Sequence, residues 1–525
     1  MSLTDLVTHF QTTTMNQLYT YISVVISCAL FLWVRSRRTR RHGPLPPSPK
    51  SDPLIGNLRA MANIVDEPRT YRDWGVELGS DIISITIPGK VIIVLNSQEA
   101  IDELLIKRSA IYSDRPHIPM IASENLVGWG HSTGIIRYGE RWRFQRKLTH
   151  EALHKTECEA RWPLLERQAR LALQRMLASP TNFSQEIRCM AGSMMLTTVY
   201  GYEVASENDS LFRTVEEAVL GFSQALVVQN YLVNTFPWLE YIPKWFPGTG
   251  WKAKADEWRH LRDLMLHVPF EWTKNRMATG TSVPCMLSSL LTRYMHRDSD
   301  LPMAELEDCI RWASGGMFAA GITPVVNSIR VFIIAMAMHP DIQAKAQAEI
   351  DNTIGTRLPE VADLESLSYV RCIIKEVLRW RLTLPLAVPH ASIQDDTYKG
   401  YFIPKGAIVI GNSWAISNNP AIYLDPDHFN PDRFLDPLVP DAPAFGYGRR
   451  ICPGLFYSEA TLFIIAASML SVFHIRPEID AEGNPIPLRA EMAMNEAVRQ
   501  LRPFQCKITP RSEKHEQMIR ELVEV

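Results

Sequence analysis

Apolar residues recur with the helical period over most of the chain, and strand-like runs are short. The segments 159–177 and 303–338 carry long patterns of this kind, which predict α-helices. Two β-branched runs, 82–87 and 91–95, flank a Pro-Gly pair and predict a hairpin, and a second hairpin with an extended run is expected over 398–410. The pattern therefore predicts a mainly α fold with small β-sheets.

The N-terminal segment departs from this globular pattern. Residues 18–34 contain no charged side chain, and about 17–25 apolar residues suffice to cross a bilayer. Asp5 is the one charged residue before this run, whereas five arginines follow it between positions 35 and 41. A cleaved signal peptide would carry its basic residues in front, and the positive-inside rule keeps the arginines in the cytosol. We expect one transmembrane helix; a buried or interfacial helix is the alternative.

The chain divides at a boundary near each end. The proline-rich residues 43–49 cannot continue a helix, and neither a repeat nor a clean linker interrupts the long segment that follows. The expected organisation is a short lumenal N-terminus (1–17), a transmembrane anchor (18–34), a basic and Pro-rich hinge (35–50), one large α-rich domain (51–510) and a charged tail (511–525).

The composition of the chain mainly excludes other classes of protein. A chain with 46% hydrophobic and 21% charged residues can bury a core, which excludes wholesale disorder. The net charge of -2 gives no basis for expecting a nucleic-acid partner. Eight cysteines occur without CxxC pairs, which argues against zinc ribbons and a disulfide framework and favours a reducing compartment.

Candidate functional residues are most concentrated in the segment 445–454, Phe-Gly-Tyr-Gly-Arg-Arg-Ile-Cys-Pro-Gly. A thiolate that binds iron needs hydrogen-bond donors and positive charge to stay ionised. Gly448 and Gly454 would let backbone amides approach the Cys452 sulfur, and Arg450 could face an anionic cofactor carboxylate. The alternative is a buried structural cysteine.

This stretch resembles the haem-binding signature of the cytochromes P450, carried here by Phe445, Gly448, Arg450, Cys452 and Gly454. The resemblance runs from the hinge to about residue 510 and is closest to microsomal enzymes of fungal secondary metabolism. It implies the cytochrome P450 fold and heme b, with Cys452 as the axial thiolate and metal ligand.

The same resemblance implies a function. It is that of a monooxygenase which uses O2 and NADPH-derived electrons to oxidise an apolar secondary metabolite by hydroxylation, phenol coupling or desaturation. A single-pass anchor in the endoplasmic reticulum membrane, a cytosolic catalytic domain and a separate NADPH–cytochrome P450 reductase would follow. A non-oxygenating isomerase or dehydratase and a haem sensor remain alternatives.

Other family motifs add candidate residues. Glu376 and Arg379 lie three positions apart and can pair on one helix face; the resemblance adds Arg433 and implies a buried structural cluster, where an ordinary surface ion pair is the alternative.

Trp142 and Arg146, four positions apart, resemble the clamp on the haem propionates, and His390 resembles a further propionate contact. The alternatives are a Trp packed on the core beside a solvated Arg, and a structural histidine.

The sequence departs from the family inside the long predicted helix. Relatives carry an acid followed by Thr where this chain has Thr323-Pro324. Proton delivery to bound oxygen is expected to use Thr323, water or a substrate hydroxyl. Thr323 is the catalytic candidate, although its hydroxyl is rotated by about 100° from the usual position. Pro324 is expected to kink the helix.

The resemblance also suggests where the substrate and the reductase bind. The expected apolar pocket segments are 118–130, 222–232, 317–320, 384–388 and 492–495. The candidates for a basic reductase-docking face are Arg141, Arg143, Lys147 and Arg449, for which a plain solvated surface is equally open.

One motif points to a different class of enzyme. His150-Glu151-Ala152-Leu153-His154 matches the H-E-x-x-H pattern of zinc metalloproteases. If both histidines lie on one helix face they could bind zinc, but no clear third ligand follows. A zinc metalloprotease is therefore a remote alternative.

Overall fold

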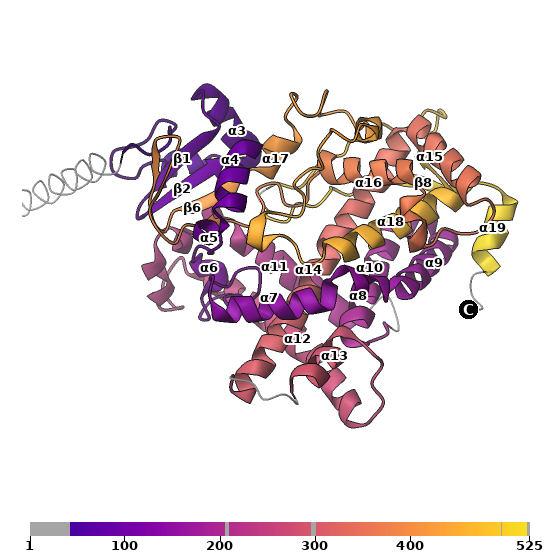
Figure 1. Ribbon diagram of the computed structural model, residues 1–525, viewed down its shortest axis with the longest axis horizontal. Coiled ribbons are helices and arrows are strands. Elements are labelled where there is room, and N and C mark those ends of the chain that lie inside the picture. Colours follow the sequence, from indigo (N-terminus) through magenta and orange to yellow (C-terminus); the bar gives the residue numbers. More distant parts are fainter. Residues whose placement is uncertain (1–42, 205–208, 296–300, 495, 522–525) are drawn as a thin grey trace, which may run out of the picture.

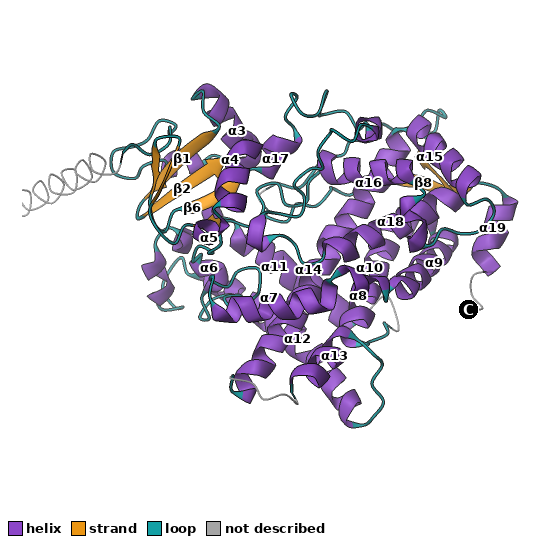
Figure 2. Ribbon diagram, in the orientation of Figure 1, coloured by secondary structure: helices purple, strands orange, loops and turns teal. Residues whose placement is uncertain are grey.

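The computed structural model describes residues 43–204, 209–295, 301–494 and 496–521. Within these residues the chain is mainly α-helical with three small sheets, as the pattern predicts (Figure 2). The lumenal segment 1–17, the predicted anchor 18–34 and the first part of the hinge lie outside the described residues.

A four-stranded sheet lies at one end of the molecule, beside helices α3 and α4 (Figure 1). Strand β1 (Ile82–Ile87) pairs antiparallel with β2 (Lys90–Leu95), which confirms the predicted hairpin. Strand β6 (Ile408–Gly411) runs parallel to β2, and β3 (His390–Ala391) pairs antiparallel with β6. The sheet thereby fixes the backbone of His390.

Helix α14 (Met303–Met338) runs through the centre of the helical part and has the bounds predicted from its pattern. It packs against α7 (Glu140–Leu153), α10 (Phe183–Tyr200), α16 (Ser368–Trp380) and α18 (Leu455–Val472). The helix continues through Pro324 without a break.

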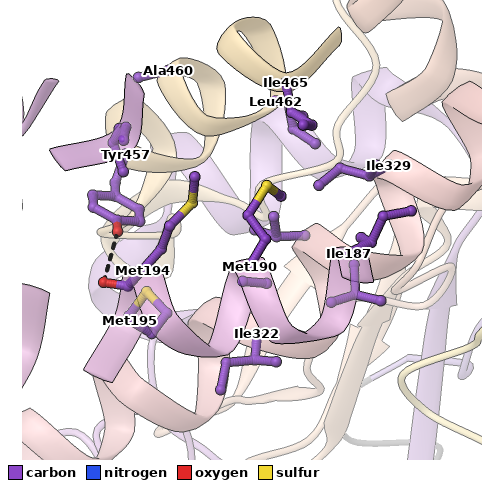
Figure 3. Close-up of a cluster of buried hydrophobic side chains, with 14 of the residues drawn as sticks. Ile187, Met190, Met194, Met195, Ile322, Ile329, Tyr457, Ala460, Leu462 and Ile465 are labelled. Carbon is purple, nitrogen blue, oxygen red and sulfur yellow. Dashed lines mark hydrogen bonds between the residues drawn. The ribbon is translucent and has the colours of Figure 1, made fainter. Parts of the chain in front are cut away.

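The main core fills the space between α10, α14 and α18 (Figure 3). Met190, Ile329 and Ile465 are at most 1% exposed there. Helices α14 and α18 are long and apolar enough to cross a membrane, but 78% of the apolar window of each is buried inside the protein. We therefore interpret both as core helices, whose burial supplies much of the hydrophobic stabilisation.

The prediction of one helix over 159–177 was wrong in its start. The chain forms α8 (Lys155–Glu159) and then α9 (Trp162–Ala178), because Pro163 favours the first turn of a helix, where its missing N–H costs no helix hydrogen bond.

The other elements are mostly short. The second predicted hairpin consists of β4 (Asp396–Tyr398) and β5 (Tyr401–Ile403), and β7 (Phe473–Pro477) pairs with β8 (Cys506–Pro510). The remaining helices are α2 (Leu58–Ala62), α3 (Glu67–Glu77), α4 (Gln98–Ile101), α5 (Ser109–Tyr112), α6 (Pro119–Ala122), α11 (Ser210–Leu226), α12 (Gly250–Ala278), α13 (Met286–Tyr294), α15 (Pro340–Thr353), α17 (Ser413–Ser417) and α19 (Glu513–Arg520). A π-helical segment, η1 (Asp102–Lys107), and the 3-10 turns η2 (Pro180–Asn182), η3 (Val228–Asn230), η4 (Leu232–Asn234), η5 (Pro237–Tyr241), η6 (Val361–Glu365), η7 (Pro431–Leu435) and η8 (Gly448–Arg450) complete the set.

Candidate functional site

A tight loop around η8 holds Cys452 in front of α18. The Cys452 N–H donates to the Phe445 carbonyl at 2.8 Å, which closes the loop. Gly448 has φ +53°, and a Cβ there would lie 2.2 Å from the carbonyl oxygen of Leu105. A side chain at this position would therefore collide with backbone, so glycine is required for the loop to pack on η1.

Two groups act on the Cys452 sulfur. Burial raises the pKa of the thiol, while a hydrogen bond from the Gly454 backbone and the charge of Arg146 on α7 lower it. A metal ion at the sulfur would remove the proton outright. The surroundings therefore favour a thiolate once a cation binds it.

The sulfur lies on the wall of a cavity of about 270 Å³, which we call the thiol cavity. Helix α14 contributes Ala320, Pro324, Val325 and Ser328 to its wall, and α18 contributes Ser458 and Leu462. The chain between α16 and β3 contributes Arg381, Leu382, Thr383, Leu384, Ala387, Val388 and His390. Arg115, Gly134, Phe445 and Arg450 also line it.

Arg450 is buried at this cavity and stacks on Trp142. Its Cζ lies 4.4 Å from the Trp142 ring centroid. Its guanidinium donates to the carbonyls of Ser113 at 2.8 Å, Thr133 at 3.1 Å and Ile136 at 2.8 Å. Burial lowers the pKa of Arg450 to about 9, so it stays charged at neutral pH.

Arg115 and His390 lie beside it. Arg115 donates to the Gly134 and Val388 carbonyls at 2.8 and 2.6 Å, and burial lowers its pKa. His390 Nδ1 lies 2.7 Å from the Tyr112 carbonyl oxygen, and burial with the nearby arginines holds its pKa well below the usual range. The imidazole is therefore neutral and donates through Nδ1.

The basic cluster of Arg115, Arg146, His390 and Arg450 fits a group with two carboxylates. The carboxylate that acts on both Arg115 and Arg450 is Asp114, whose oxygens already accept from Arg137 and the Tyr138 backbone N–H. Buried cations need anionic partners. A cavity with a thiol and apolar walls beside buried guanidinium groups matches the iron, ring and propionates of haem.

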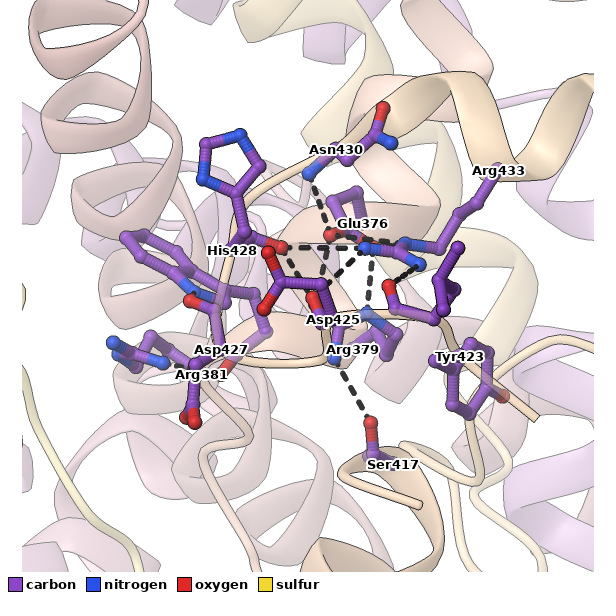
Figure 4. A network of polar contacts seen from close by, with 12 residues as sticks. Glu376, Arg379, Arg381, Ser417, Tyr423, Asp425, Asp427, His428, Asn430 and Arg433 are labelled. Atoms are coloured by element: carbon purple, nitrogen blue, oxygen red, sulfur yellow. Dashed lines mark hydrogen bonds and ion pairs between the residues drawn. The ribbon is translucent and has the colours of Figure 1, made fainter. Parts of the chain in front are cut away.

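The structure brings Glu376, Arg379 and Arg433 together (Figure 4). Arg379 donates to both Glu376 oxygens, at 2.6 and 2.7 Å, and both side chains are fully buried. Arg433 Nε lies 3.2 Å from the same carboxylate, and the Asn430 backbone N–H donates to it. The cluster links α16 to η7, and none of its three residues lines the thiol cavity.

Thr323 does not line the thiol cavity. It lines a second cavity with Arg188 and Glu216, whereas its neighbours on α14, Ala320 and Pro324, line the thiol cavity. Adjacent helix positions point about 100° apart. The hydroxyl of Thr323 therefore does not lie in the wall that faces Cys452.

Sequence reasoning missed Arg115 and Thr383. Arg115 stands in the Ser113-Asp114-Arg115-Pro116 stretch. It belongs to the site because it is buried against the segment before β3, which is distant in the sequence. Thr383 Oγ1 accepts from Asn327 Nδ2 at 2.9 Å, which leaves its own hydroxyl hydrogen for the cavity.

Two of the predicted pocket segments, 317–320 and 384–388, reach the thiol cavity. The segments 118–130 and 222–232 pack on each other, since the rings of Trp129 and Phe222 lie 5.0 Å apart. Among the described residues these segments contribute Trp129 and Phe222 to the core or its edge, and neither segment contributes to the lining of the thiol cavity.

The zinc alternative lacks a third ligand among the described residues. Helix α7 ends at Leu153 with His154 as its C-cap, and the rings of His150 and His154 lie 6.0 Å apart. Glu151 accepts from Arg293 at 3.0 Å and from Tyr294 Oη at 2.8 Å. Within the described ranges no cluster of three His, Cys, Asp or Glu side chains could hold a metal ion.

The basic candidates separate into two groups. Arg143, Lys147 and Arg449 are exposed, and both Arg143 and Arg449 lie over the Tyr138 ring. Arg141 instead forms an ion pair with Asp308 on α14 and is 22% exposed. The exposed face therefore has three cations.

Comparisons with known proteins agree with this site. A family model described as Cytochrome P450 matches residues 46–502. The chain is 38% identical over 499 residues to a cytochrome P450 monooxygenase of Armillaria gallica, covering 93% of this chain and 96% of the relative. It is 36% identical to one of Coprinopsis cinerea, covering 96% of each. It is also 35% identical to the tryptamine 4-monooxygenase of Psilocybe cyanescens, covering 94% and 97%.

Proposed function

Because the chain belongs to the cytochrome P450 family, we propose that it binds heme b through Cys452 and oxidises a small apolar secondary metabolite with O2 and NADPH-derived electrons. The observation that carries this proposal is the Cys452 thiol on the wall of a cavity that also holds buried cations. Bound haem would supply the activation of oxygen that hydroxylation, phenol coupling or desaturation needs.

The chain's own residues would hold the haem. The amide of Gly454 and the charge of Arg146 favour the ionised sulfur, and Phe445 and Gly448 fix the loop. Charge-assisted hydrogen bonds from guanidinium groups suit carboxylates. The residues proposed to contact the haem carboxylates are Trp142, Arg146, His390, Arg450 and, added from the cavity lining, Arg115.

The substrate side is proposed to be apolar. Ala320, Val325, Leu382, Leu384 and Val388 line the thiol cavity, and removing their apolar surface from water would drive binding. A relative named tryptamine 4-monooxygenase supports a small organic substrate.

A redox partner follows from the family, and the specific donor is proposed to be NADPH–cytochrome P450 reductase. Arg143, Lys147 and Arg449 are exposed cations on the side of α7 and the Cys452 loop. Complementary charge would steer an acidic reductase surface to this face. Because these cations lie next to the Cys452 loop, a reductase bound to them would have a short electron-transfer path to the haem.

Attachment to the endoplasmic reticulum membrane is proposed as well, with the catalytic domain in the cytosol. The segment between α11 and α12 exposes five large apolar side chains: Leu232 66%, Trp238 61%, Tyr241 79%, Trp245 81% and Phe246 50%. Lys90, at the tip of the first hairpin, donates to the Asn234 carbonyl at 2.6 Å, and Ser84 in the same sheet donates to Pro46. The apolar segment and the hinge that follows the predicted anchor therefore both contact this sheet, which would allow both to face one bilayer.

Membranes from a host that makes this chain together with a reductase test the proposal. An apolar metabolite should be oxidised when NADPH and O2 are both supplied, and membranes with the reductase alone should leave it unchanged. Turnover of a pre-oxidised substrate without NADPH would support the isomerase or dehydratase instead. A ligand-dependent spectral change without any turnover would support the haem sensor.

A further inference from the structure

A second cavity lies against α14, next to the thiol cavity, and we call it the α11 cavity. Its volume of about 190 Å³ gives room for several water molecules. Thr323 and Val326 form its α14 wall, and Glu217 and Leu220 on α11 are exposed at its rim. The polar lining residues are Arg188, Glu216, Glu217, Ser223, Thr323 and Gln500. The α11 cavity therefore connects solvent with the centre of α14.

Glu216 lies inside this cavity and is paired with Arg188 of α10 at 3.5 Å, with 29% of its side chain exposed. Burial and the charge of Glu217 raise the pKa of the Glu216 carboxyl, whereas the charge of Arg188 lowers it. A carboxyl in these surroundings releases and regains a proton more readily at neutral pH than a fully solvated one.

Thr323 and Ala320 mark the boundary between the two cavities. They are three positions apart on α14 and are neighbours on its surface, and Ala320 lines the thiol cavity. Pro324 has no N–H, so it cannot donate to the Ala320 carbonyl as a residue in a regular helix would. That carbonyl is thus available to accept from a water or a hydroxyl at the boundary.

Each turnover of a monooxygenase consumes protons together with electrons, so a buried site needs a supply of protons. We propose that the α11 cavity is this supply: Glu216 and Thr323 pass protons from solvent to the thiol cavity past the Ala320 carbonyl. This inference rests on the proposed function.

The transfer balances in protons. A proton from solvent water adds to the Glu216 carboxylate. The resulting carboxyl donates through a cavity water to the Thr323 hydroxyl, whose own hydrogen moves on to a water held at the boundary by the Ala320 carbonyl and from there into the thiol cavity. Glu216 returns to its carboxylate and is protonated again from the rim. Thr323 thus acts as a relay from the side of α14 that lines the α11 cavity.

Glu216→Gln and Thr323→Val in the full-length haem-loaded enzyme test the route. Product formed per NADPH should fall by about tenfold in each variant, with hydrogen peroxide taking up the electrons. The double variant should be no worse than either single one, because both act on one path. Thr323→Ser should restore coupling, since it keeps the hydroxyl.

A second readout does not use activity. A crystal structure of the haem-loaded enzyme should show ordered water between the Glu216 carboxylate and Thr323 Oγ1, and Thr323→Val should lose it. Glu305→Gln is the matched control, because Glu305 is exposed on the first turn of α14 and does not line either cavity.

Two results would overturn the inference: a Glu216→Gln enzyme as tightly coupled as Glu305→Gln, or a dry α11 cavity. These differ from failure of the proposed function, in which the wild-type chain itself would consume no NADPH with substrate.

Discussion

Thr323 and Pro324 are adjacent on α14, yet they line different cavities: Thr323 the α11 cavity, and Pro324 the thiol cavity beside Cys452. The α-helix keeps its register across the pair, so neighbouring positions of one helix face two different cavities. Pro324 lines the thiol cavity and lacks the N–H that would donate to the Ala320 carbonyl.

Pro324→Ala should stabilise the protein and impair its reaction. Alanine restores the N–H that can donate to the Ala320 carbonyl, and a helix-internal proline costs about 3 kcal/mol at most sites, so we expect a gain of about 1–3 kcal/mol in the free energy of unfolding. Coupling of NADPH to product should fall. Thermal unfolding and peroxide release measure the two effects. Pro269→Ala, in the interior of α12, is the control for coupling and should leave it unchanged; equal coupling in both variants would contradict the account.

Glu376→Gln should be strongly destabilising. It removes the charge that Arg379 and Arg433 share in a fully buried site, and loss of one partner of such a pair costs about 3–5 kcal/mol. Lys345 and Asp432 form a matched surface pair at 2.8 Å, with 48% and 53% exposure. Lys345→Gln should cost no more than about 1 kcal/mol. Urea unfolding compares the two, and similar losses would show that the cluster does not stabilise the fold.

Gly448→Ala should release haem. Its φ of +53° and the nearby Leu105 carbonyl impose strain of about 1–3 kcal/mol on any side chain, and the loop that holds Cys452 must shift to relieve it. Haem content per polypeptide measures the effect. Gly139→Ala is the control, since Gly139 is extended and has open space around its Cβ position. Full haem retention in the Gly448 variant would argue against the loop geometry.

His390 should make the haem-free protein sensitive to acid. Burial and the neighbouring arginines lower its folded-state pKa, while in the unfolded chain its pKa is about 6.5. Protonation therefore favours unfolding: stability is intact above about pH 6.5 and is lost as pH falls from there toward the folded pKa. His390→Gln should remove up to about 1.4 kcal/mol per pH unit of that slope.

Urea unfolding of the haem-free protein at several pH values measures the slope for His390. Haem carboxylates near the imidazole should raise its pKa and flatten the slope in the loaded protein. Parallel pH curves for wild type and variant would show that protonation of His390 is not what destabilises the protein in acid.

The helix 303–338 and the first hairpin could be predicted from local sequence. A long apolar repeat determines the helix, and two β-branched runs around Pro-Gly determine the hairpin, without distant partners. The Cys452 loop could be located for the same reason. The second cavity that Thr323 lines could not be predicted, since it depends on which neighbours α14 meets. The burial of Arg115 depends on a segment that is distant in the chain, and the end of α7 before His154 depends on packing that the H-E-x-x-H pattern does not contain.

The central claim is that Cys452 is the axial ligand of haem. The absorption spectrum of the reduced, carbon-monoxide-bound protein tests it most directly, with Cys452→His as the comparison. The account predicts the red-shifted band of a thiolate-ligated haem in the wild type, and its replacement by the band of a histidine-ligated haem in the variant at equal haem content. A wild-type protein that is folded and loaded with haem but lacks the red-shifted band, or a variant that keeps it, would contradict the account.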